Sequence, residues 1–450
     1  METPALHLPG SVQSVLQALE KAGFEAAVVG GAVRDALRGE APGDWDVATS
    51  ARPAQVQAAL SGWRVAGTGL RHGTVTAVVD GMPVEVTTYR EDGAYSDHRR
   101  PDGVRFTGSL AEDLARRDFT INAMAWSPRR GLVDPFGGRA DLARSLVRCV
   151  GEPARRFSED ALRILRALRF AAVYDMQIEP ATEAALDAHK ALLRAVSAER
   201  VQAELAKLLC GKAAGRVLTQ YAGVLAAVLP EVRPMFGFDQ KNPHHDRDVW
   251  AHTAAVVDGV PPRPALRWAA LLHDSGKPAC FTQDAQGVGH FYGHAERSVA
   301  IAQGVLERLR FSHALRDEVL ALVQRHDAPL VPQSKAVRRL LRRMGEAGAR
   351  DLIALHEADA LGQAPSSRAR LETYRQVRDI LDELVAQNAC FSLRSLAVNG
   401  RDMMALGLKG PQIGKALAAC LDEVTGERLP NERAALLRFA RGRAEEEAFS

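Results

Sequence analysis

The spacing of apolar residues changes along this chain of 450 residues. In the first third, short apolar runs and alternating apolar and polar positions predict strands separated by helical segments. Residues 26–29 form an apolar run typical of a buried strand, and residues 75–79 and 84–89 are two further candidates around a turn at 80–83. From Ser158 onward, apolar residues recur every three or four positions and strand patterns almost vanish. The pattern therefore predicts an α/β domain followed by helical domains.

Segments rich in proline, glycine or polar residues interrupt the apolar pattern at four places, near residues 151–153, 230–243, 329–332 and 363–367. A chain of this length has room for about three or four domains. We expect a head at residues 1–145, a helical neck at 146–235, a histidine-rich helical domain at 236–365, and a helical body and tail at 366–450.

Composition narrows the class of protein without identifying a partner. The chain is 46% hydrophobic and 25% charged, with no apolar run of about 18 residues and no leader-like N-terminus, so we expect a cytoplasmic globular protein with no membrane partner. The five cysteines lack Cys-x-x-Cys spacing, which disfavours a disulfide framework and a zinc ribbon. The 58 basic and 55 acidic residues leave a net charge of only +3, which neither demands nor excludes nucleic acid.

Two glycines directly follow the first predicted strand. Gly30 and Gly31 allow a tight turn into a helix that carries Arg34, and the exposed amides of such a turn suit a triphosphate. Asp44 and Asp46 follow, two positions apart, so on a strand they would face the same way and offer oxygen ligands to Mg²⁺. Either piece alone reads as an ordinary loop or strand end. Their order and closeness favour nucleotidyl transfer.

Five motifs then occur in an order that resembles the class II tRNA nucleotidyltransferase and poly(A) polymerase family, which includes the CCA-adding enzymes. The resemblance covers about residues 20–215 and resumes near 395. The motifs are Gly30-Gly31-x-x-Arg34-Asp35 with Asp44-x-Asp46, residues 116–123 (RRDFTINA), residues 134–142 (DPFGGRADL), Glu159-Asp160-x-x-Arg163, and Glu199-Arg200 with Glu204. The resemblance implies a nucleotidyltransferase head with a mixed sheet, followed by all-α neck, HD, body and tail domains.

The resemblance also implies roles for individual residues. Asp44 and Asp46 would hold catalytic Mg²⁺, and Glu85 would supply a third carboxylate or receive the primer proton, unless it is an inward structural charge. Asp160 and Arg163, three apart on one expected helix face, would select CTP and ATP by their base edges, although a surface ion network with Glu159 remains an alternative. The nucleotide-binding residues expected in all are Gly30, Gly31, Arg34, Arg117, Asp118, Asn122, Asp160, Arg163, Arg166 and Arg169.

A polar, proline-bounded segment at residues 95–102 resembles the flexible loop of the same family. In that family the loop is associated with the switch toward ATP, and relatives that add only two C residues have a shortened one. Its presence favours addition of the terminal A, either as the last step of full CCA synthesis or as the sole reaction.

Histidines cluster in the third predicted domain, where eight of the 13 fall between residues 244 and 326. His252, His273-Asp274, His294 and His326-Asp327 resemble an HD phosphohydrolase domain, which implies a site for Mn²⁺, Ni²⁺, Co²⁺ or Mg²⁺. The expected ligands are His252, His273, Asp274 and Asp327, with His294 outer or bridging and Asp359 as the rival for the last position. His244, His245, His290 and His313 are expected at the surface. The implied activity is hydrolysis of phosphoesters such as 2′,3′-cyclic phosphates, with a degenerate domain kept for packing as the alternative.

The segment from Leu396 to Lys415 resembles the tail of bacterial CCA-adding enzymes. Lys409, Lys415 and the amides of residues 410–414 would hold RNA phosphates, although an ordinary helical hairpin fits equally well. The sequence thus predicts an enzyme, monomeric or homodimeric, that adds CCA or its terminal A to tRNA from CTP and ATP. The alternatives are a poly(A) polymerase, and an HD hydrolase or RNA-binding protein with an inactive transferase head.

Overall fold

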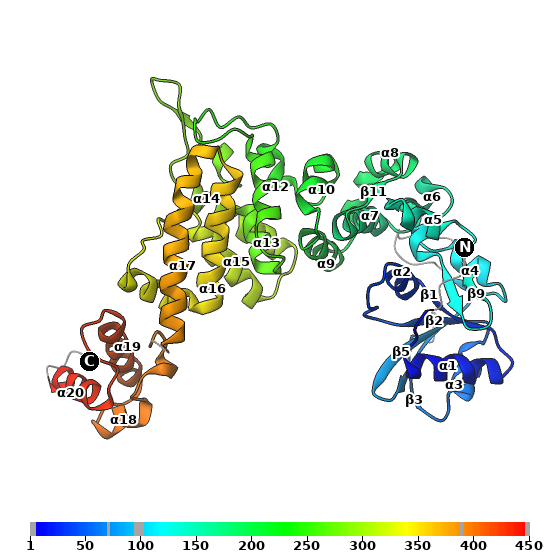
Figure 1. The fold of residues 1–450 in the computed structure, drawn as a ribbon, viewed down its shortest axis with the longest axis horizontal. Helices are drawn as coiled ribbons and strands as arrows, with labels where there is room; N and C mark the ends of the chain where they lie inside the picture. The colour runs from blue at the N-terminus through cyan, green and yellow to red at the C-terminus, as the bar shows by residue number, and fades with distance from the viewer. Residues whose placement is uncertain (1–5, 70–72, 94–102, 388–389, 446–450) are drawn as a thin grey trace. The chain divides into compact units, whose positions relative to one another are not determined.

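The computed structural model describes residues 6–69, 73–93, 103–387 and 390–445, which form two compact units divided at residue 230 (Figure 1). The first unit contains the mixed α/β sheet that the sequence predicts, and the second is almost entirely helical. None of the helices in these described ranges combines the length and the apolarity that a membrane crossing requires.

The first unit is built on a seven-stranded sheet with the strand order β3-β4-β5-β2-β1-β8-β9. Strands β2 and β5 run parallel, whereas the other neighbours are antiparallel, so the sheet is mixed. Its strands are β1 (Ala26–Val29), β2 (Asp46–Thr49), β3 (Arg64–Gly69), β4 (Thr74–Val79), β5 (Met82–Thr88), β8 (Ala125–Ser127) and β9 (Gly131–Val133). All three strands predicted from the apolar pattern are present, β1 with the predicted bounds and β4 and β5 with bounds shifted by one or two residues.

Both faces of this sheet are covered, which explains why β1 is apolar at every position. Val28 and Val47 face a core closed by α1 (Gly10–Lys21) and α3 (Pro53–Ala59). Val29 and Ala48 face a second core closed by α4 (Leu110–Ala115).

Helices follow the sheet in the remainder of the first unit. The longest, α7 (Leu162–Tyr174), is buried along most of its length and packs against α9 (Ala198–Leu209). The others are α2 (Gly31–Leu37), α5 (Gly138–Ala143), α6 (Pro153–Glu159), α8 (Pro180–His189), α10 (Ala214–Gln220) and α11 (Ala222–Leu225). The short strands β10 (Leu146–Val147) and β11 (Gln177–Ile178) form a parallel pair beside α7.

The second unit begins with a bundle of helices that surrounds the histidine cluster. Its helices are α12 (Val249–Gly259), α13 (Pro264–Leu272), α14 (His294–Arg308), α15 (His313–Arg325), α16 (Ser334–Gly362) and α17 (Arg370–Ala386). A hairpin of β12 (Thr282–Gln283) and β13 (Gly289–His290) connects α13 to α14. Gly345, with φ at +69°, breaks the helical conformation within α16.

The chain ends in three helices with a small core of their own, α18 (Gly400–Ala405), α19 (Pro411–Thr425) and α20 (Arg433–Glu445). The predicted helix, glycine turn and second helix are therefore present, with Gly410 in the left-handed region immediately before α19. Contact of Lys409 and Lys415 with RNA stays a prediction.

Candidate functional site

The glycine turn after β1 takes the conformation that the sequence predicts. Gly30 has φ at +72° and α2 begins at the next residue, so the turn requires glycine for its backbone alone. A Cβ atom at Gly30 would also lie 2.7 Å from Nη1 of Arg117. The absence of a side chain therefore lets the Arg117 guanidinium approach the turn.

The carboxylates gather beside this turn, although not quite as predicted. Asp46 opens β2, but Asp44 lies before the strand, so the expectation that both occupy one strand is wrong. Asp46 instead pairs in parallel register with Glu85 of β5, which places both on the same face of the sheet.

The pKa of Asp46 is raised although its side chain reaches solvent. Atoms crowded around its carboxyl group remove water from it, and the charges of Glu85 and Asp44 add to this, whereas Arg117 opposes it. A bound cation would relieve this repulsion, and carboxylate oxygens are the ligands that Mg²⁺ prefers. The residues present therefore fit the metal that the sequence predicts.

A chain of hydrogen bonds links the glycine turn to α7. Nη1 of Arg34 donates to Oδ1 of Asn122 at 2.6 Å, and Nδ2 of Asn122 donates to Oδ1 of Asp118 at 2.9 Å. Nε of Arg166 donates to the other Asp118 oxygen at 2.7 Å. Burial by itself would raise the pKa of Asp118, but Arg166, Asn122 and Arg163 outweigh it and hold the pKa below its usual range. Asp118 therefore stays ionised and fixed in position.

Asp160 and Arg163 are arranged differently from the prediction. Helix α6 ends at Glu159 and Asp160 has extended backbone angles, so Asp160 and Arg163 do not share one helix. Nη1 of Arg163 donates to Oε2 of Glu159 at 2.7 Å, and Asp160 accepts from Arg200 at 2.8 Å. Arg163 is buried rather than part of an exposed ion network. Burial and the bond to Glu159 together fix the position of the Arg163 guanidinium.

The ring of Phe170 was not anticipated from the sequence. The guanidinium carbons of Arg169, Arg34 and Arg166 lie 4.0, 5.1 and 5.6 Å from its centroid. Oε2 of Glu204 lies 2.6 Å from Nε of Arg169. Phe170 is one of many apolar residues in the α7 pattern, so no sequence signal distinguishes it from ordinary core. Glu204 also lies 4.0 Å from Nη1 of Arg166, so the face of the Phe170 ring and this carboxylate together offset the positive charge of the arginines gathered here.

One cavity of about 410 Å³ gathers these residues. All ten predicted nucleotide-binding residues line it, together with Asp46. Arg116, Leu162, Phe170 and Arg200 line it as well and were not predicted as site residues. Glu85 and Asp44 stand near Asp46 but outside this lining, and residues 95–102, the predicted loop, lie outside the described part of the chain.

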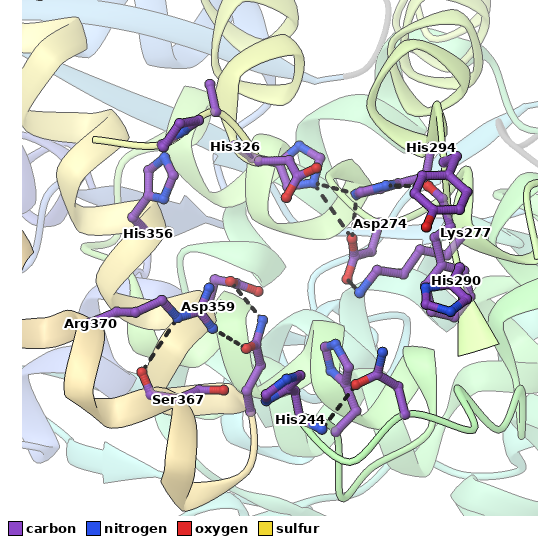
Figure 2. Close-up of a pocket in the computed structure, with 18 of the residues that line it drawn as sticks. His244, Asp274, Lys277, His290, His294, His326, His356, Asp359, Ser367 and Arg370 are labelled. Atoms are coloured by element: carbon purple, nitrogen blue, oxygen red, sulfur yellow. Dashed lines mark hydrogen bonds and ion pairs between the residues drawn. The ribbon is translucent and has the colours of Figure 1, made fainter. Parts of the chain in front are cut away.

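The second unit holds a different site, built where its helices begin and end (Figure 2). His252 lies within α12, and His273 and Asp274 follow α13. His294 begins α14, His326 ends α15, and Asp359 belongs to α16. These side chains line or border a cavity of about 820 Å³ and form two potential ligand groups, His252, His273, Asp274 and Asp359, and Asp274, His294 and His326.

The four histidines of the two ligand groups each have one ring nitrogen within hydrogen-bond distance of a backbone carbonyl. Nδ1 lies 2.8 Å from Ala270 O in His273, 2.8 Å from Phe291 O in His294 and 2.7 Å from Val323 O in His326. Nδ1 of His252 lies 3.2 Å from Gly362 O. A carbonyl only accepts, so Nδ1 is the donor in all four, which leaves Nε2, with a lone pair in the neutral form of the ring, to face the cluster.

Asp274 lies between the two groups. Its Oδ2 is 3.1 Å from Nε2 of His273 and 3.5 Å from Nε2 of His252, whereas its Oδ1 is 3.6 Å from Nε2 of both His294 and His326. Nε2 of His273 is buried and makes no hydrogen bond. Lone pairs that face carboxylate oxygens repel unless a cation or a proton lies between them. The set therefore fits divalent metal, with each Asp274 oxygen directed at one ligand group.

One expectation about the ligands of this site is corrected. Asp327 was expected to complete the ligand set, but the buried side chain of His326 occupies the inward direction and Asp327 is exposed at the cavity rim. Asp359 belongs to the ligand group instead, with Oδ1 3.1 Å from Nε2 of His252.

Of the four histidines expected at the surface, His244 and His313 are exposed as predicted, whereas His245 and His290 are half-buried. His244, His245 and His290 line the cavity, and His245 packs on His252 with ring centroids 5.6 Å apart. Only His313 is both exposed and outside the lining. His356, Lys277 and Arg370 also line the cavity, and no spacing rule had identified them.

Three sequence models of known families match parts of this chain. The sequence model of the poly A polymerase head domain matches residues 26–148, that of an RNA- and SrmB-binding site of polymerase A matches 175–236, and that of tRNA nucleotidyltransferase domain 2 matches 284–440.

Whole-chain relatives agree with these matches. A CCA-adding enzyme of Levilactobacillus brevis is 35% identical over 96% of this chain and 98% of its own length. The crystal structure of the Bacillus stearothermophilus CCA-adding enzyme in complex with CTP is 29% identical, with a TM-score of 0.70 over 98% of this chain and all of its own. The Thermotoga maritima CCA-adding enzyme complexed with tRNA, at 18% identity and a TM-score of 0.56, shares the fold.

Proposed function

This chain belongs to the CCA-adding enzymes, the class II tRNA nucleotidyltransferases, and from that premise we propose that its first unit adds C, C and A to tRNA 3′ ends from CTP and ATP. The observation that supports this most is the single cavity in which the glycine turn, Asp46 and the predicted nucleotide-binding residues meet. Relatives named for CCA addition favour the full sequence over addition of A alone.

In the reaction, the 3′-hydroxyl oxygen of the tRNA attacks the α-phosphorus, and the bond from that phosphorus to the leaving pyrophosphate breaks. Mg²⁺ held by Asp44 and Asp46 would supply charge neutralisation for this displacement. The amides at Gly30 and Gly31 and the Arg34 and Arg117 guanidinium groups bind the triphosphate. Glu85 faces the same side of the sheet as Asp46 and receives the hydroxyl proton.

Base selection falls to the side chains between α6 and α9. Asp160 offers acceptors and Arg163 donors, and together they match the edges of cytosine and adenine without a nucleic-acid template. Glu159 and Arg200 hold the two in place, while Arg166 positions Asp118. The partners proposed are therefore tRNA, CTP and ATP.

For the histidine site of the second unit, we propose metal-dependent hydrolysis of phosphoesters, including 2′,3′-cyclic phosphates. His252, His273, Asp274 and Asp359 would hold one divalent metal, with His294 and His326 on the other side of Asp274. Bound Mn²⁺, Ni²⁺, Co²⁺ or Mg²⁺ would supply an activated water. Lys277, whose Nζ lies 2.8 Å from Asp274 Oδ2, and Arg370 across the cavity would bind the phosphate oxygens.

The transferase is tested by incubating the purified chain with a tRNA transcript that lacks its 3′ CCA, together with CTP and ATP. Sequencing of the extended ends is expected to show CCA and nothing longer. A single A on CC-ending tRNA only would reduce the activity to terminal A addition, and a run of A residues would indicate a poly(A) polymerase.

The hydrolase is tested separately, with 2′,3′-cyclic AMP and added Mn²⁺ or Ni²⁺. EDTA and His273→Ala are each expected to abolish hydrolysis, while His273→Ala leaves CCA addition intact. Hydrolysis that persists in both cases would remove this site from consideration.

A further inference from the structure

Tyr292 stands out on the rim of the histidine cavity because its side chain is 78% exposed. Among large apolar side chains in the described part of the chain, it is the most exposed. An aromatic ring that is exposed at the rim of a cavity offers its face to a planar group bound there.

The side-chain ring of His290 stacks on the ring of Tyr292. The two rings are nearly parallel, at 9°, with centroids 5.5 Å apart. Asp284 fixes His290 in turn, with its Oδ2 2.8 Å from Nε2 of His290. One face of the Tyr292 ring therefore stacks on the His290 ring, and its other face is open to a planar group of a ligand.

The backbone around Tyr292 is anchored as well. Gly289 donates to the carbonyl of Lys241 at 2.7 Å, and a Cβ atom on Gly289 would lie 2.1 Å from Gln240 O, so the hairpin is seated closely on the preceding segment. Phe291 packs beside Lys277, whose Nζ lies 5.3 Å from the Phe291 ring centroid. The exposed ring is therefore presented by a fixed segment.

Its place relative to the metal-ligand groups is set by the chain itself. Tyr292 precedes His294 by two residues, so their Cα atoms are at most about 7 Å apart. Figure 2 shows His290 and Lys277 on the same side of the cavity and Arg370 on the opposite side. Stacking surface, cationic side chains and metal ligands thus border one cavity of about 820 Å³, a size typical of small-molecule sites.

We propose that Tyr292, backed by His290, is the stacking platform for the nucleobase of a phosphoester whose phosphate lies at Asp274 and Lys277. The substrate class is then a nucleoside phosphate, either a free nucleotide or the 3′-terminal nucleotide of an RNA. This rests on the hydrolase proposed above for the same cavity. Stacking on a ring face is indifferent to base identity, so adenine, cytosine, guanine and uracil esters are all accepted.

The kinetic test compares a phosphoester that carries a base with one that does not. The ratio of kcat/KM for 2′-AMP to kcat/KM for glycerol 2-phosphate is measured in the full chain with Mn²⁺. Tyr292→Ala is expected to lower this ratio about tenfold or more, since a base stacked on an aromatic side chain is worth about that. Tyr292→Leu, which keeps apolar bulk without a planar face, is expected to lower it similarly, and Tyr292→Phe to restore it.

An unchanged ratio in Tyr292→Ala and Tyr292→Leu would overturn the platform, because kcat/KM would then change equally, or not at all, for the two substrates. An RNA oligonucleotide ending in a 2′,3′-cyclic phosphate is run beside cyclic AMP, and a Tyr292-dependent rate with either one supports the stacking role.

Binding separates this proposal from the hydrolase on which it rests. In EDTA no metal-dependent turnover occurs, and equilibrium dialysis of radiolabelled 2′-AMP measures affinity alone. The Kd is expected to rise several-fold in Tyr292→Ala and to stay near its original value in Tyr292→Phe, while the first-unit cavity is identical in all the proteins. If the wild-type chain hydrolyses neither substrate, the hydrolase fails but this binding difference still decides the platform. Equal Kd values in all three proteins would refute it.

Discussion

Nη1 of Arg34 donates to Oδ1 of Asn122 at 2.6 Å, although 88 residues separate the two in the chain. Asn122 passes the connection on to Asp118, which Arg166 binds from α7. One amide side chain therefore connects the glycine turn that we propose binds the triphosphate to the helix that we propose selects the base.

Removal of that amide is expected to weaken nucleotide binding. Asn122→Ala leaves Arg34 without this acceptor and the buried Asp118 without this donor, at a cost of about 2 kcal/mol. We expect a higher KM for CTP in tRNA extension and a lower denaturation midpoint. Asn431→Ala, which removes an exposed asparagine bonded to Ala397, is the control and is expected to leave the KM unchanged. An unchanged KM in Asn122→Ala would contradict the role of the network.

The carboxylate pair is tested by Asp46→Asn. The amide keeps the size of the side chain but loses the charge that we propose holds Mg²⁺, so incorporation of radiolabelled CMP is expected to fall to background. Binding of tRNA, measured by filter retention, is expected to remain. Asp80→Asn is the matched control because Asp80 lies in the exposed turn between β4 and β5, and asparagine tolerates its φ of +50°. Normal turnover in Asp46→Asn would exclude the metal role.

Two glycine substitutions separate backbone strain from the approach of Arg117. Gly30 and Gly81 both have positive φ, at +72° and +81°, so alanine at either position is expected to cost about 1 kcal/mol. Only at Gly30 would the added Cβ meet a neighbour, Nη1 of Arg117. We therefore expect Gly30→Ala to raise the KM for CTP and ATP and Gly81→Ala to leave it unchanged. Equal KM values would mean that Arg117 moves without consequence.

Asp359 and Asp327 compete for one role in the histidine site, and the structure favours Asp359. Asp359→Asn is expected to abolish hydrolysis of 2′,3′-cyclic AMP and to lower the metal content measured by mass spectrometry. Asp327→Asn changes an exposed carboxylate outside both ligand groups and is expected to retain most of the activity. The reverse result would restore the assignment made from the sequence.

Burial raises the pKa of the Cys149 thiol to about 12 and that of Cys420 to about 11, against about 9 ordinarily. Because thiolate is the reactive form, both are expected to resist iodoacetamide at pH 8.5 in the native protein and to react once it is unfolded. As the pH rises above about 9, the unfolded thiols lose protons that the native thiols keep. The contribution of these two groups to the free energy of unfolding therefore falls between about pH 9 and pH 12. Peptide mass mapping against the half-buried Cys210 and Cys280 checks this. Rapid native labelling of Cys149 would contradict it.

Local patterns predicted much of the first unit correctly. The apolar run at 26–29, the two strands around the turn at Asp80 and the glycine turn before α2 all depend on short-range spacing and on backbone freedom, which the sequence carries directly. The order of the motifs then identified nucleotide-binding residues without any knowledge of distances, and all of these residues line one cavity in the structure.

Spacing failed where a helix ended or a neighbour intervened. Asp160 and Arg163 were expected on one helix because they lie three apart, but α6 ends at Glu159 and α7 begins at Leu162, so Asp160 lies outside both helices and each residue binds another partner. From the His-Asp pair at 326–327 only Asp327 was expected to be a ligand, yet His326 is buried in the cluster and Asp327 is exposed.

The amino-acid sequence by itself determined the α/β head, the helical remainder and the residue types able to hold phosphate and metal, because these follow from hydrophobic period and side-chain chemistry. Tertiary structure alone decided that Glu85 stands beside Asp46, that Phe170 supports three arginines, and that Asp359 replaces Asp327. Those relationships join elements far apart in the chain, and their geometry depends on how strands pair and helices pack, which no local pattern encodes.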